Sequence, residues 1–573
     1  MMKTYYADVL SKVLYEHLSH EKIVQLIETP KYETHGDLAF PCFELAKVLK
    51  KSPVQIANEL VEQIHSDIFS KVEAVGPYVN VFLNRKEISI PIIEEILQKK
   101  EKYGSSIDGK GQTIVVDLSS PNIAKPFSMG HLRSTVIGNS ICQIAQKVGY
   151  QTVGINHLGD WGTQFGKLMY AYLTWGDEAK VKASPIKELN KLYVYFHEMA
   201  QDNPALENEG RIWFKKLEEG DEEATRLWTW FREVSLKDFQ RIYDLLDVQF
   251  DSYNGEAFFN DKMDDVVRLL EEKNLLIESD GAKVVDLSEY NLPPCLIKKS
   301  DGATLYATRD LAAAIYRQNT YHFSQAIYVV GGEQALHFQQ FFHVLEKMGY
   351  DWVKGMKYVP FGLMMKDGKK MSTRKGKTIL LEEVLQEAIG LSKKNIQEKN
   401  PDLSNADEVA RQVGVGAVIF HDLKNERTNN CEFSLESMLK PEGETGPYIQ
   451  YTHARACSIL RKSPIALDKI HFNGLTDDYS WTIIKLLEQF PEIISRAFHR
   501  YEPSVISKYL LDLAQSFNKY YGQVRVLEVD EQIHSRLALL VAVVTVLAEG
   551  LRLLGIQAPQ ELSLIHISEP TRP

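Results

Sequence analysis

One stretch of this chain, SSPNIAKPFSMGHLRST at residues 119–135, gathers residue types that can hold a nucleotide. Gly130 lets a base or ribose approach the backbone because no Cβ stands in the way. The amides of a helix N-terminus attract phosphate, and Lys125 and His131 can add hydrogen-bond donors. An isolated Gly-His pair is more often part of an ordinary strand–loop–helix connection. The elements around the stretch therefore decide between the two interpretations.

The segments on both sides of this stretch predict a strand followed by a helix. Residues 114–118 form a compact apolar run, which indicates a buried parallel strand. Residues 132–148 carry apolar residues at positions that suit a helix packed on that strand. The stretch then lies at the carboxyl end of a strand, where open α/β sheets bind their ligands. We therefore favour the nucleotide site.

Polar residues also follow two other predicted strands. A short strand at 152–156 precedes HLGDWGTQ at 157–164, whose small and polar residues are typical of a second ligand loop. A strand at 326–330 precedes the polar run 331–334 and then His337. These groups are expected at the same edge of a parallel sheet as the first loop.

A helix that opens near residue 306 carries a further pair. Tyr306 and Asp310 are four residues apart, so they share one face of that helix. A lone pair of this kind is usually a surface contact. The long charged region at about 175–285 is expected to be a helical insertion whose charges form a solvated face.

The third group is a lysine-rich loop at 366–377, in which five lysines and one arginine stand beside glycines. Such a loop can close over a triphosphate and neutralise the charge that builds on a leaving pyrophosphate. A generic basic loop is more often an exposed turn. The sequence contains no GxxxxGK[ST] motif, so an ATP site here is not of the P-loop type.

Two segments outside this region can contact RNA. The predicted strand at 76–84 carries Asn80 and Phe82, which would read an unpaired base if exposed, although the buried alternative is favoured about two to one. The helical region at 444–462 interleaves aromatic, amide and basic side chains. That pattern fits a single-stranded RNA surface and an ordinary amphipathic helix with a basic side about equally.

Composition sets outer limits on the class of protein. A chain of 573 residues implies roughly three to five domains. The net charge of −11 argues against a general coater of nucleic acid but permits local basic patches. The five cysteines are scattered, which argues against disulfides and a zinc ribbon, and the apolar run 537–548 is too short to span a bilayer. With no leader pattern at the N-terminus, these features predict a cytoplasmic protein without a tightly bound metal or organic cofactor.

Taken together, the motifs resemble those of the class I aminoacyl-tRNA synthetases, and of the arginyl-tRNA synthetases in particular. SMGHLRST is similar to the first nucleotide signature of that class, and KMSTR at 370–374 to its second. PNIAKP, NHLGDWGTQFG at 156–166, LYATRDLAA at 305–313 and YIQYTHAR at 448–455 are similar to the arginine-specific branch. The likeness covers residues 1–562 in the expected order.

Two positions depart from the family pattern. Ser128 stands where the first signature often carries a histidine, so it receives no catalytic role. The second lysine of the loop is replaced by Thr373, followed by Arg374. In enzymes of this kind a lysine near the first signature is thought to compensate, and Lys125 is placed for that role.

The resemblance implies an α/β fold: a Rossmann-type catalytic domain with a mixed α/β N-terminal domain and an all-helical anticodon-binding domain. The expected boundaries are 1–107 for the N-terminal domain, 111–385 for the catalytic domain, 386–445 for a helical connection and 446–562 for the anticodon-binding domain. Residues 563–573 have no clear period and are expected to be a non-native or disordered tail.

The implied reaction joins arginine to ATP as arginyl-adenylate, releases pyrophosphate, and transfers arginine to the 3′ end of tRNA(Arg). The resemblance gives catalytic roles to Lys125, His131 and Lys370. It places ATP against Ser128, Gly130, His131, His337, Lys370, Met371 and Ser372. It places arginine against Asp117, Asn122, His131, Tyr306, Asp310 and Gln334. It places tRNA against Asn80, Phe82, Tyr448, Gln450, Tyr451 and Arg455.

A guanidinium presents a planar fork of donors, which carboxylates match best. Rejection of analogues that lack those hydrogen bonds is strong enough that no editing domain is required. The expected partners are tRNA(Arg), arginine and ATP with Mg²⁺. The protein is expected to be a monomer that binds neither DNA nor a membrane. Bound tRNA is expected to be required before arginine is activated. Two alternatives stay open: another class I synthetase, and a non-catalytic tRNA-binding paralogue.

Overall fold

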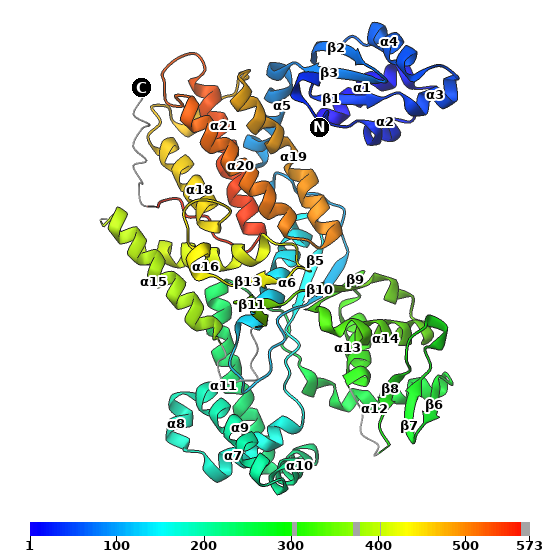
Figure 1. The fold of residues 1–573 in the computed structure, drawn as a ribbon, viewed down its shortest axis with the longest axis vertical. Helices are drawn as coiled ribbons and strands as arrows, with labels where there is room; N and C mark the ends of the chain where they lie inside the picture. Colours follow the sequence, from blue (N-terminus) through cyan, green and yellow to red (C-terminus); the bar gives the residue numbers. More distant parts are fainter. Residues whose placement is uncertain (301–305, 371–378, 402, 563–573) are drawn as a thin grey trace. The chain divides into compact units, whose positions relative to one another are not determined.

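Two compact units make up the computed structural model, which describes residues 1–300, 306–370, 379–401 and 403–562 (Figure 1). One unit combines Met1–Gly104, Thr452–Ile493 and Tyr509–Glu549. The other contains Ser105–Tyr451, Ile494–Lys508 and the segment from Gly550. Each unit is described by itself below.

The second unit is built on a four-stranded parallel sheet in the order β10-β9-β4-β5. Its strands are β4 (Thr113–Asp117), β5 (Gln151–Ile155), β9 (Gln325–Gly331) and β10 (Met356–Phe361). Apolar residues at successive strand positions, such as Ile114, Val115 and Val116, are all buried, as expected for strands covered on both faces. The sheet confirms the predicted parallel α/β architecture.

Helices cover this sheet on both faces. Helix α6 (Met129–Lys147) packs on β4, β5 and β9, whereas α13 (Tyr306–Tyr321) and α14 (Ala335–Lys347) share a core cluster with Val115 of β4. Because side chains alternate along a strand, Val115 faces away from its two neighbours. Helix α6 begins at Met129, so Gly130 and His131 lie in its first turn.

Between β5 and β9 the chain forms a helical cluster and a small sheet. The helices are α7 (Thr163–Trp175), α8 (Glu178–Ala183), α9 (Pro185–Asp202), α10 (Ala205–Glu218), α11 (Glu222–Leu246) and α12 (Met263–Glu272). An antiparallel sheet joins β6 (Leu276–Ser279), β7 (Ala282–Val285) and β8 (Cys295–Lys298). Strands β6 and β7 lie within the predicted helical insertion, and their sheet is separate from the parallel one.

After β10 the chain forms a third sheet and three helices. Strands β11 (Met364–Lys366) and β12 (Lys369–Lys370) pair as a hairpin, and β11 also pairs with β13 (Cys431–Glu432). The helices are α15 (Leu381–Lys399), α16 (Ala406–Leu423) and α17 (Leu435–Met438).

The first unit joins a small α/β element to a helical bundle. An antiparallel sheet in the order β1-β3-β2 contains β1 (Leu38–Pro41), β2 (Phe69–Val75) and β3 (Tyr78–Leu83). Around it lie α1 (Met2–Leu14), α2 (His20–Leu26), α3 (Phe43–Leu49), α4 (Pro53–Gln63) and α5 (Arg85–Lys99). Asp37 accepts a hydrogen bond of 2.9 Å from Nε1 of Trp481, which ties this element to the bundle within the unit.

Four long helices carry the C-terminal part of the chain: α18 (Gly446–Arg461), α19 (Asp478–Arg500), α20 (Ser504–Gln523) and α21 (Ile533–Leu553). The apolar run 537–548 lies inside α21 and is largely buried, which confirms it as a core helix. In the described part of the chain, no helix combines the length and hydropathy needed to cross a membrane.

Candidate active site

The parallel sheet has a topological switch point between β4 and β9. From β4 the chain crosses through α6 to β5 on one side, and from β9 it crosses through α14 to β10 on the other. The two central strands pair directly, with Asp117 opposite Tyr328. Crossovers that leave in opposite directions open a crevice at the carboxyl ends of such strands, and ligands bind there.

The loop that leaves β4 is held in a strained conformation. Ser119, Ser120 and Ala124 have φ angles of 72°, 52° and 58°, in the left-handed region that non-glycine residues rarely adopt. Hydrogen bonds fix this shape: the Ser119 amide donates to Ser134 Oγ (2.9 Å), and the Ala124 amide donates to Ser235 Oγ (2.8 Å). Strained loops held by their surroundings are typical of functional sites.

His131 sits in the first turn of α6 with a defined hydrogen-bonding role. Its Nδ1 accepts the Ser128 amide hydrogen at 3.1 Å, so the proton of the neutral ring lies on Nε2. Burial, with the nearby Lys125 ammonium, lowers the pKa of His131 to about 4. At neutral pH the ring therefore offers an uncharged Nε2–H donor to a ligand.

Gly130 leaves the approach to this turn open. It is exposed, and a Cβ built on it would meet only Ser128 Oγ, at the ordinary contact distance of 3.5 Å. The protein itself therefore tolerates a side chain here. The advantage of glycine at this position lies in the close approach of a ligand.

The first and second predicted ligand loops meet through Asn122 and Gly159. A bridge joins these residues, and the Ile123 amide donates to the Gly159 carbonyl at 3.1 Å. A Cβ at Gly159 would lie 2.0 Å from Oδ1 of Asn122, so only glycine leaves room for that side chain. Asn122 is exposed at the switch point, where an amino-acid substrate can reach it.

Lys125 is half-buried in the same loop. Its Nζ lies 5.3 Å from the centre of the Tyr193 ring, a cation–π contact with helix α9. Burial lowers the pKa of Lys125. An ammonium that has lost part of its hydration interacts more strongly with a phosphate placed nearby.

Asp117 has a different environment from the one predicted. Arg317 of α13 places Nη1 2.9 Å from its carboxylate Oδ2, and Ser120 Oγ donates to Oδ1 at 2.9 Å. The carboxylate predicted to bind the substrate guanidinium is therefore already paired with a buried arginine of the protein. Direct binding of the substrate would require Asp117 to share its oxygens with Arg317.

Asp310 pairs with His337, which the resemblance had placed against ATP. His337 Nε2 lies 2.6 Å from Asp310 Oδ2. Burial acts to lower the pKa of His337, but the hydrogen bond and charge of Asp310 outweigh it and raise the pKa. Tyr306, one turn before Asp310, is 63% exposed, and Gln334 is exposed just before α14. Asp310, Tyr306 and Gln334 thus stand along the β9 side of the crevice.

Three ionisable residues near the crevice were not predicted from the sequence as site residues: Asp160, Glu256 and His157. The side chain of Asp160 is almost fully buried and accepts from Arg232 Nε at 3.1 Å and the Ala257 amide at 2.8 Å. Burial, with the charges of Asp310 and Asp160, raises the pKa of Glu256 to about 7, while Arg309 opposes the rise. His157 is partly buried, and its buried Nδ1 has no hydrogen-bond partner among the described residues.

The sequence held only part of the signal for these three residues. His157 and Asp160 lie in the predicted second ligand loop. The composition of that loop does not indicate which of its residues belong to the site. Glu256 lies in a charged region that was interpreted as a solvated face. Its burial against Asp160 and Asp310 arises from tertiary structure, which no local spacing indicates.

The chain that follows the lysine-rich loop is paired with the start of α6. The Met129 amide donates to the Ile379 carbonyl at 3.2 Å, and the Leu381 amide donates to the Phe127 carbonyl at 3.0 Å. The backbone of Lys370 lies in β12, whereas Met371 and Ser372 lie outside the described residues. The described chain just after the lysine-rich loop is therefore held beside the first turn of α6.

The residues predicted to contact tRNA have mixed environments. Asn80 is 3% exposed and donates to the His35 carbonyl at 2.7 Å, and Gln450 is fully buried and donates to the carbonyls of Gln412 and Gln557. Burial removes these two amides from the surface that base contact requires. Phe82, Tyr448, Tyr451 and Arg455 are partly exposed.

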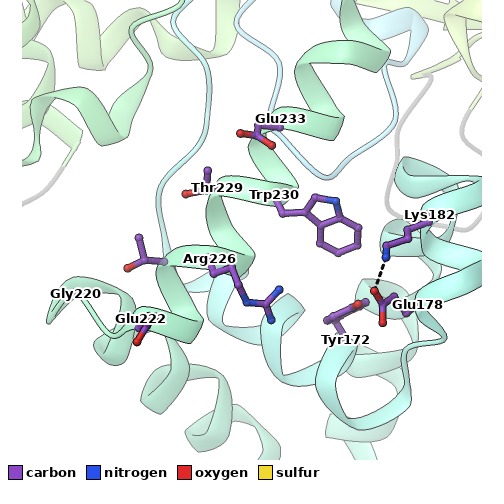
Figure 2. Close-up of a pocket in the computed structure, with 10 residues that line it drawn as sticks. Tyr172, Glu178, Lys182, Gly220, Glu222, Arg226, Thr229, Trp230 and Glu233 are labelled. Atoms are coloured by element: carbon purple, nitrogen blue, oxygen red, sulfur yellow. Dashed lines mark ion pairs between the residues drawn. The ribbon is translucent and has the colours of Figure 1, made fainter.

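A cavity of about 730 Å³ lies elsewhere in this unit, between helices α7, α8 and α11 (Figure 2). Trp230 and Tyr172 lie beside each other in it, and Lys182 pairs with Glu178. None of the predicted site residues lines it. Within the described ranges, no group of three His, Cys, Asp or Glu side chains is arranged to hold a metal ion.

Comparison with known proteins identifies matching families over three ranges. The catalytic domain of class I tRNA synthetases (R) matches residues 92–435, the DALR anticodon binding domain matches 449–562, and the arginyl tRNA synthetase N terminal domain matches 2–83. Together these ranges cover most of the chain.

Individual relatives agree. An arginine–tRNA ligase of Exiguobacterium sibiricum is 67% identical over 560 residues, 98% of this chain and 100% of the relative. Arginine–tRNA ligase 2 of Bacillus anthracis is 63% identical with the same coverage. The solved arginyl-tRNA synthetase of Thermus thermophilus is 26% identical, with a TM-score of 0.79 over 98% of this chain and 100% of that chain. The Plasmodium falciparum enzyme has a TM-score of 0.79 at 25% identity, covering 98% of both chains.

These matches extend over nearly the full length and agree with the motifs and the sheet topology. The activity is therefore the ATP-dependent attachment of arginine to tRNA. The chain belongs to the arginyl-tRNA synthetase family of class I aminoacyl-tRNA synthetases.

Proposed function

We propose that arginyl-adenylate forms at the switch point between β4 and β9, from arginine and Mg²⁺-bound ATP. The observation that carries this proposal is the pairing of residues 379 and 381 with residues 127–129, which holds the chain that follows the lysine-rich loop beside the first turn of α6. Acidic side chains lie in the same unit at that crevice, and a guanidinium needs such acceptors.

The first step is an attack by a carboxylate oxygen of arginine on the α-phosphorus of ATP. The new O–P bond forms as the bond to pyrophosphate breaks. Such a reaction depends mainly on positioning and on stabilising charge. We assign the adenosine and α-phosphate to Gly130 and the Nε2–H of His131, and the charge on the leaving pyrophosphate to Lys125 and Lys370. By resemblance, Ser128, Met371 and Ser372 complete the ATP site.

In the second step a ribose hydroxyl at the tRNA 3′ end attacks the arginyl carbonyl, and AMP leaves. The backbone and side-chain donors that held the α-phosphate remain in place for the departing AMP. Mg²⁺ accompanies ATP through phosphate oxygens, as is usual for this ion.

Arginine itself is assigned to the β9 side of the crevice. Asp310 supplies a carboxylate to the guanidinium, with the Tyr306 hydroxyl one turn away and Glu256 as a second acceptor. Asn122 and Gln334, both exposed, are assigned to the amino and carboxylate groups. Asp117 acts by holding Arg317 in place.

Transfer RNA is the macromolecular partner of this family. We assign contacts to Phe82 in the N-terminal domain and to Tyr448, Tyr451 and Arg455 near the start of the helical domain. Arg455 already holds the Asn518 amide oxygen at 2.7 Å, which fixes its position on α18. We also propose that the enzyme acts as a monomer in the cytoplasm.

The test is to charge total tRNA with each labelled amino acid in turn. The proposal predicts incorporation of arginine alone, with His131→Gln showing a raised KM for ATP. A matched variant, Lys191→Ala, removes an exposed lysine of α9 that pairs with Glu188 and should charge normally. Incorporation of another amino acid, or an unchanged KM for ATP in the His131 variant, would contradict the assignment.

A further inference from the structure

A short segment after α16, residues 425–432, contacts the chain that leads to the lysine-rich loop. We call this segment the tie segment, and we call the chain that it contacts, residues 360–365, the stem of the loop. The Gly362 amide donates to the Arg427 carbonyl at 2.9 Å, and the Leu363 amide donates to Asn430 Oδ1 at 2.8 Å. Strand β13, which ends the segment, pairs with β11. A Cβ at Gly362 would lie 2.5 Å from the Asn429 carbonyl oxygen, so the two backbones are in close contact.

The tie segment also holds helix α6, whose first turn carries His131. Arg133 of α6 donates from Nη1 to the Asn429 carbonyl at 2.8 Å. The same guanidinium pairs through Nε with Asp422 at 3.0 Å, and both side chains are 1% exposed. A buried, multiply bonded arginine has little freedom, so movement of the segment must displace α6 or break these contacts.

A third contact joins the segment to the corner between α19 and α20. The Arg427 amide donates to both carboxylate oxygens of Glu502 at 3.3 Å, and its Nε donates to the Tyr501 carbonyl at 3.1 Å. Its Nη1 donates to the Pro360 carbonyl of β10 at 2.7 Å. One guanidinium thus bridges the corner and the strand that precedes the lysine-rich loop.

The corner is itself rigidly defined. Tyr501 has a φ of 50°, and its hydroxyl donates to Gln325 Oε1 at 2.8 Å, at the start of β9. Helices α19 and α20 run from this corner, in the catalytic unit, into the other unit. The corner also lies within the range that matches the anticodon-binding domain. It is therefore one of the points at which residues of that range contact the elements of the proposed ATP site.

We propose that Arg427 is a positioning residue, which couples the α19–α20 corner to the ATP site by fixing the stem of the lysine-rich loop against α6. This inference rests on the proposed ATP site at His131 and the loop. It assigns Arg427 no contact with substrate. Its role is to hold two backbone carbonyls, Pro360 and Tyr501, at a set separation. A change in Arg427 should therefore affect the use of ATP more than the use of arginine.

The experiment measures tRNA charging by the full chain, with ATP and arginine varied separately. Arg427→Ala is expected to raise the KM for ATP about tenfold while the KM for arginine changes less than about twofold. Arg427→Lys keeps the charge but can reach only one of the two carbonyls. Its KM for ATP should therefore lie between those of the wild type and Arg427→Ala. A merely structural role would change both KM values together or lower the active fraction alone.

A matched control is Lys508→Ala. Lys508, on α20, pairs with Glu426 of the tie segment at 3.7 Å, but both side chains are exposed. Its KM for ATP should equal that of the wild type. Equal shifts in both KM values, or a Lys508 variant that matches Arg427→Ala, would overturn the proposal. If Arg427→Ala does not fold, the test uses Arg427→Lys. A KM for ATP that rises more than the KM for arginine supports the proposal, and equal changes overturn it. His131→Gln with an unchanged KM for ATP would instead refute the ATP site itself.

Discussion

Arg317 Nη1, from helix α13, lies 2.9 Å from Oδ2 of Asp117 at the carboxyl end of β4, and both residues are buried. Asp117 is consequently paired before any substrate arrives. Three other acidic residues lie near the crevice: Asp310, Glu256 and Asp160. Asp310 is paired with His337, and Asp160 is paired with Arg232. Burial, with a smaller contribution from the charges of Asp310 and Asp160, raises the pKa of Glu256 to about 7. A substrate guanidinium would relieve the repulsion among these carboxylates.

The raised pKa of Glu256 predicts how arginine binding depends on pH. The ionised carboxylate binds a guanidinium, whereas the protonated form does not, so lowering the pH through about 7 weakens arginine binding. We expect the KM for arginine to rise as the pH falls below about 7 and to level off above it. In Glu256→Gln this dependence should disappear. The KM for ATP serves as the internal control, since His131, with a pKa of about 4, stays neutral over this range. A wild-type KM for arginine that is flat with pH would contradict the assignment.

Lys125 is predicted to act on phosphate and not on tRNA. Lys125→Ala should slow adenylate formation by about 10²- to 10³-fold, the usual effect of losing one donor to developing charge. Its tRNA dissociation constant should stay within about twofold of the wild-type value. Rapid-quench measurement of adenylate, together with filter binding of tRNA, separates the two effects. Weaker tRNA binding with a normal adenylate rate would remove Lys125 from the ATP site.

The pair between Arg133 and Asp422 predicts a large effect on stability. Asp422→Ala leaves a buried guanidinium without its carboxylate, which destabilises a fold by about 3–5 kcal/mol. Asp351→Ala breaks an exposed pair with Lys354 and should change stability by less than about 0.5 kcal/mol. Urea denaturation of the two variants, monitored by circular dichroism, gives the comparison. Similar midpoints for both variants would show that the buried pair is not required.

Activation of arginine is predicted to depend on tRNA. Binding energy from a large substrate can be used to align the reacting groups, and such alignment is absent until that substrate binds. We therefore expect negligible ATP–pyrophosphate exchange with arginine alone and strong exchange after addition of cognate tRNA. Non-cognate tRNA at the same concentration is the control. Full exchange without tRNA would show that the ATP site is aligned in the free enzyme.

The nucleotide loop could be predicted from sequence because its signals are local. An apolar strand, a polar loop and Gly130 at a helix start occupy one short stretch, and the structure places them as expected. Helix α6 begins at Met129, and Ser128 and His131 form the capping box at its start.

Other features depended on distant parts of the chain. The pairing of Asp117 with Arg317 and the burial of Glu256 arise from elements that are far apart in sequence. Asn80 and Gln450 sit at positions where alternation or helical spacing permits either burial or exposure, and tertiary packing buries both. Periodicity assigns a residue to a face of its element, but it does not say what covers that face.

Asp310 is proposed to be the carboxylate at the β9 side of the crevice that selects arginine. The most direct test compares charging by wild type and Asp310→Ala, with arginine and ATP varied separately. Asp261→Ala, which removes an exposed aspartate paired with Lys262, is the matched control. In Asp310→Ala we expect kcat/KM for arginine to fall by about 100-fold or more, because a charge-assisted contact is lost. The KM for ATP should stay near that of the wild type. Wild-type kinetics for arginine in Asp310→Ala would contradict it.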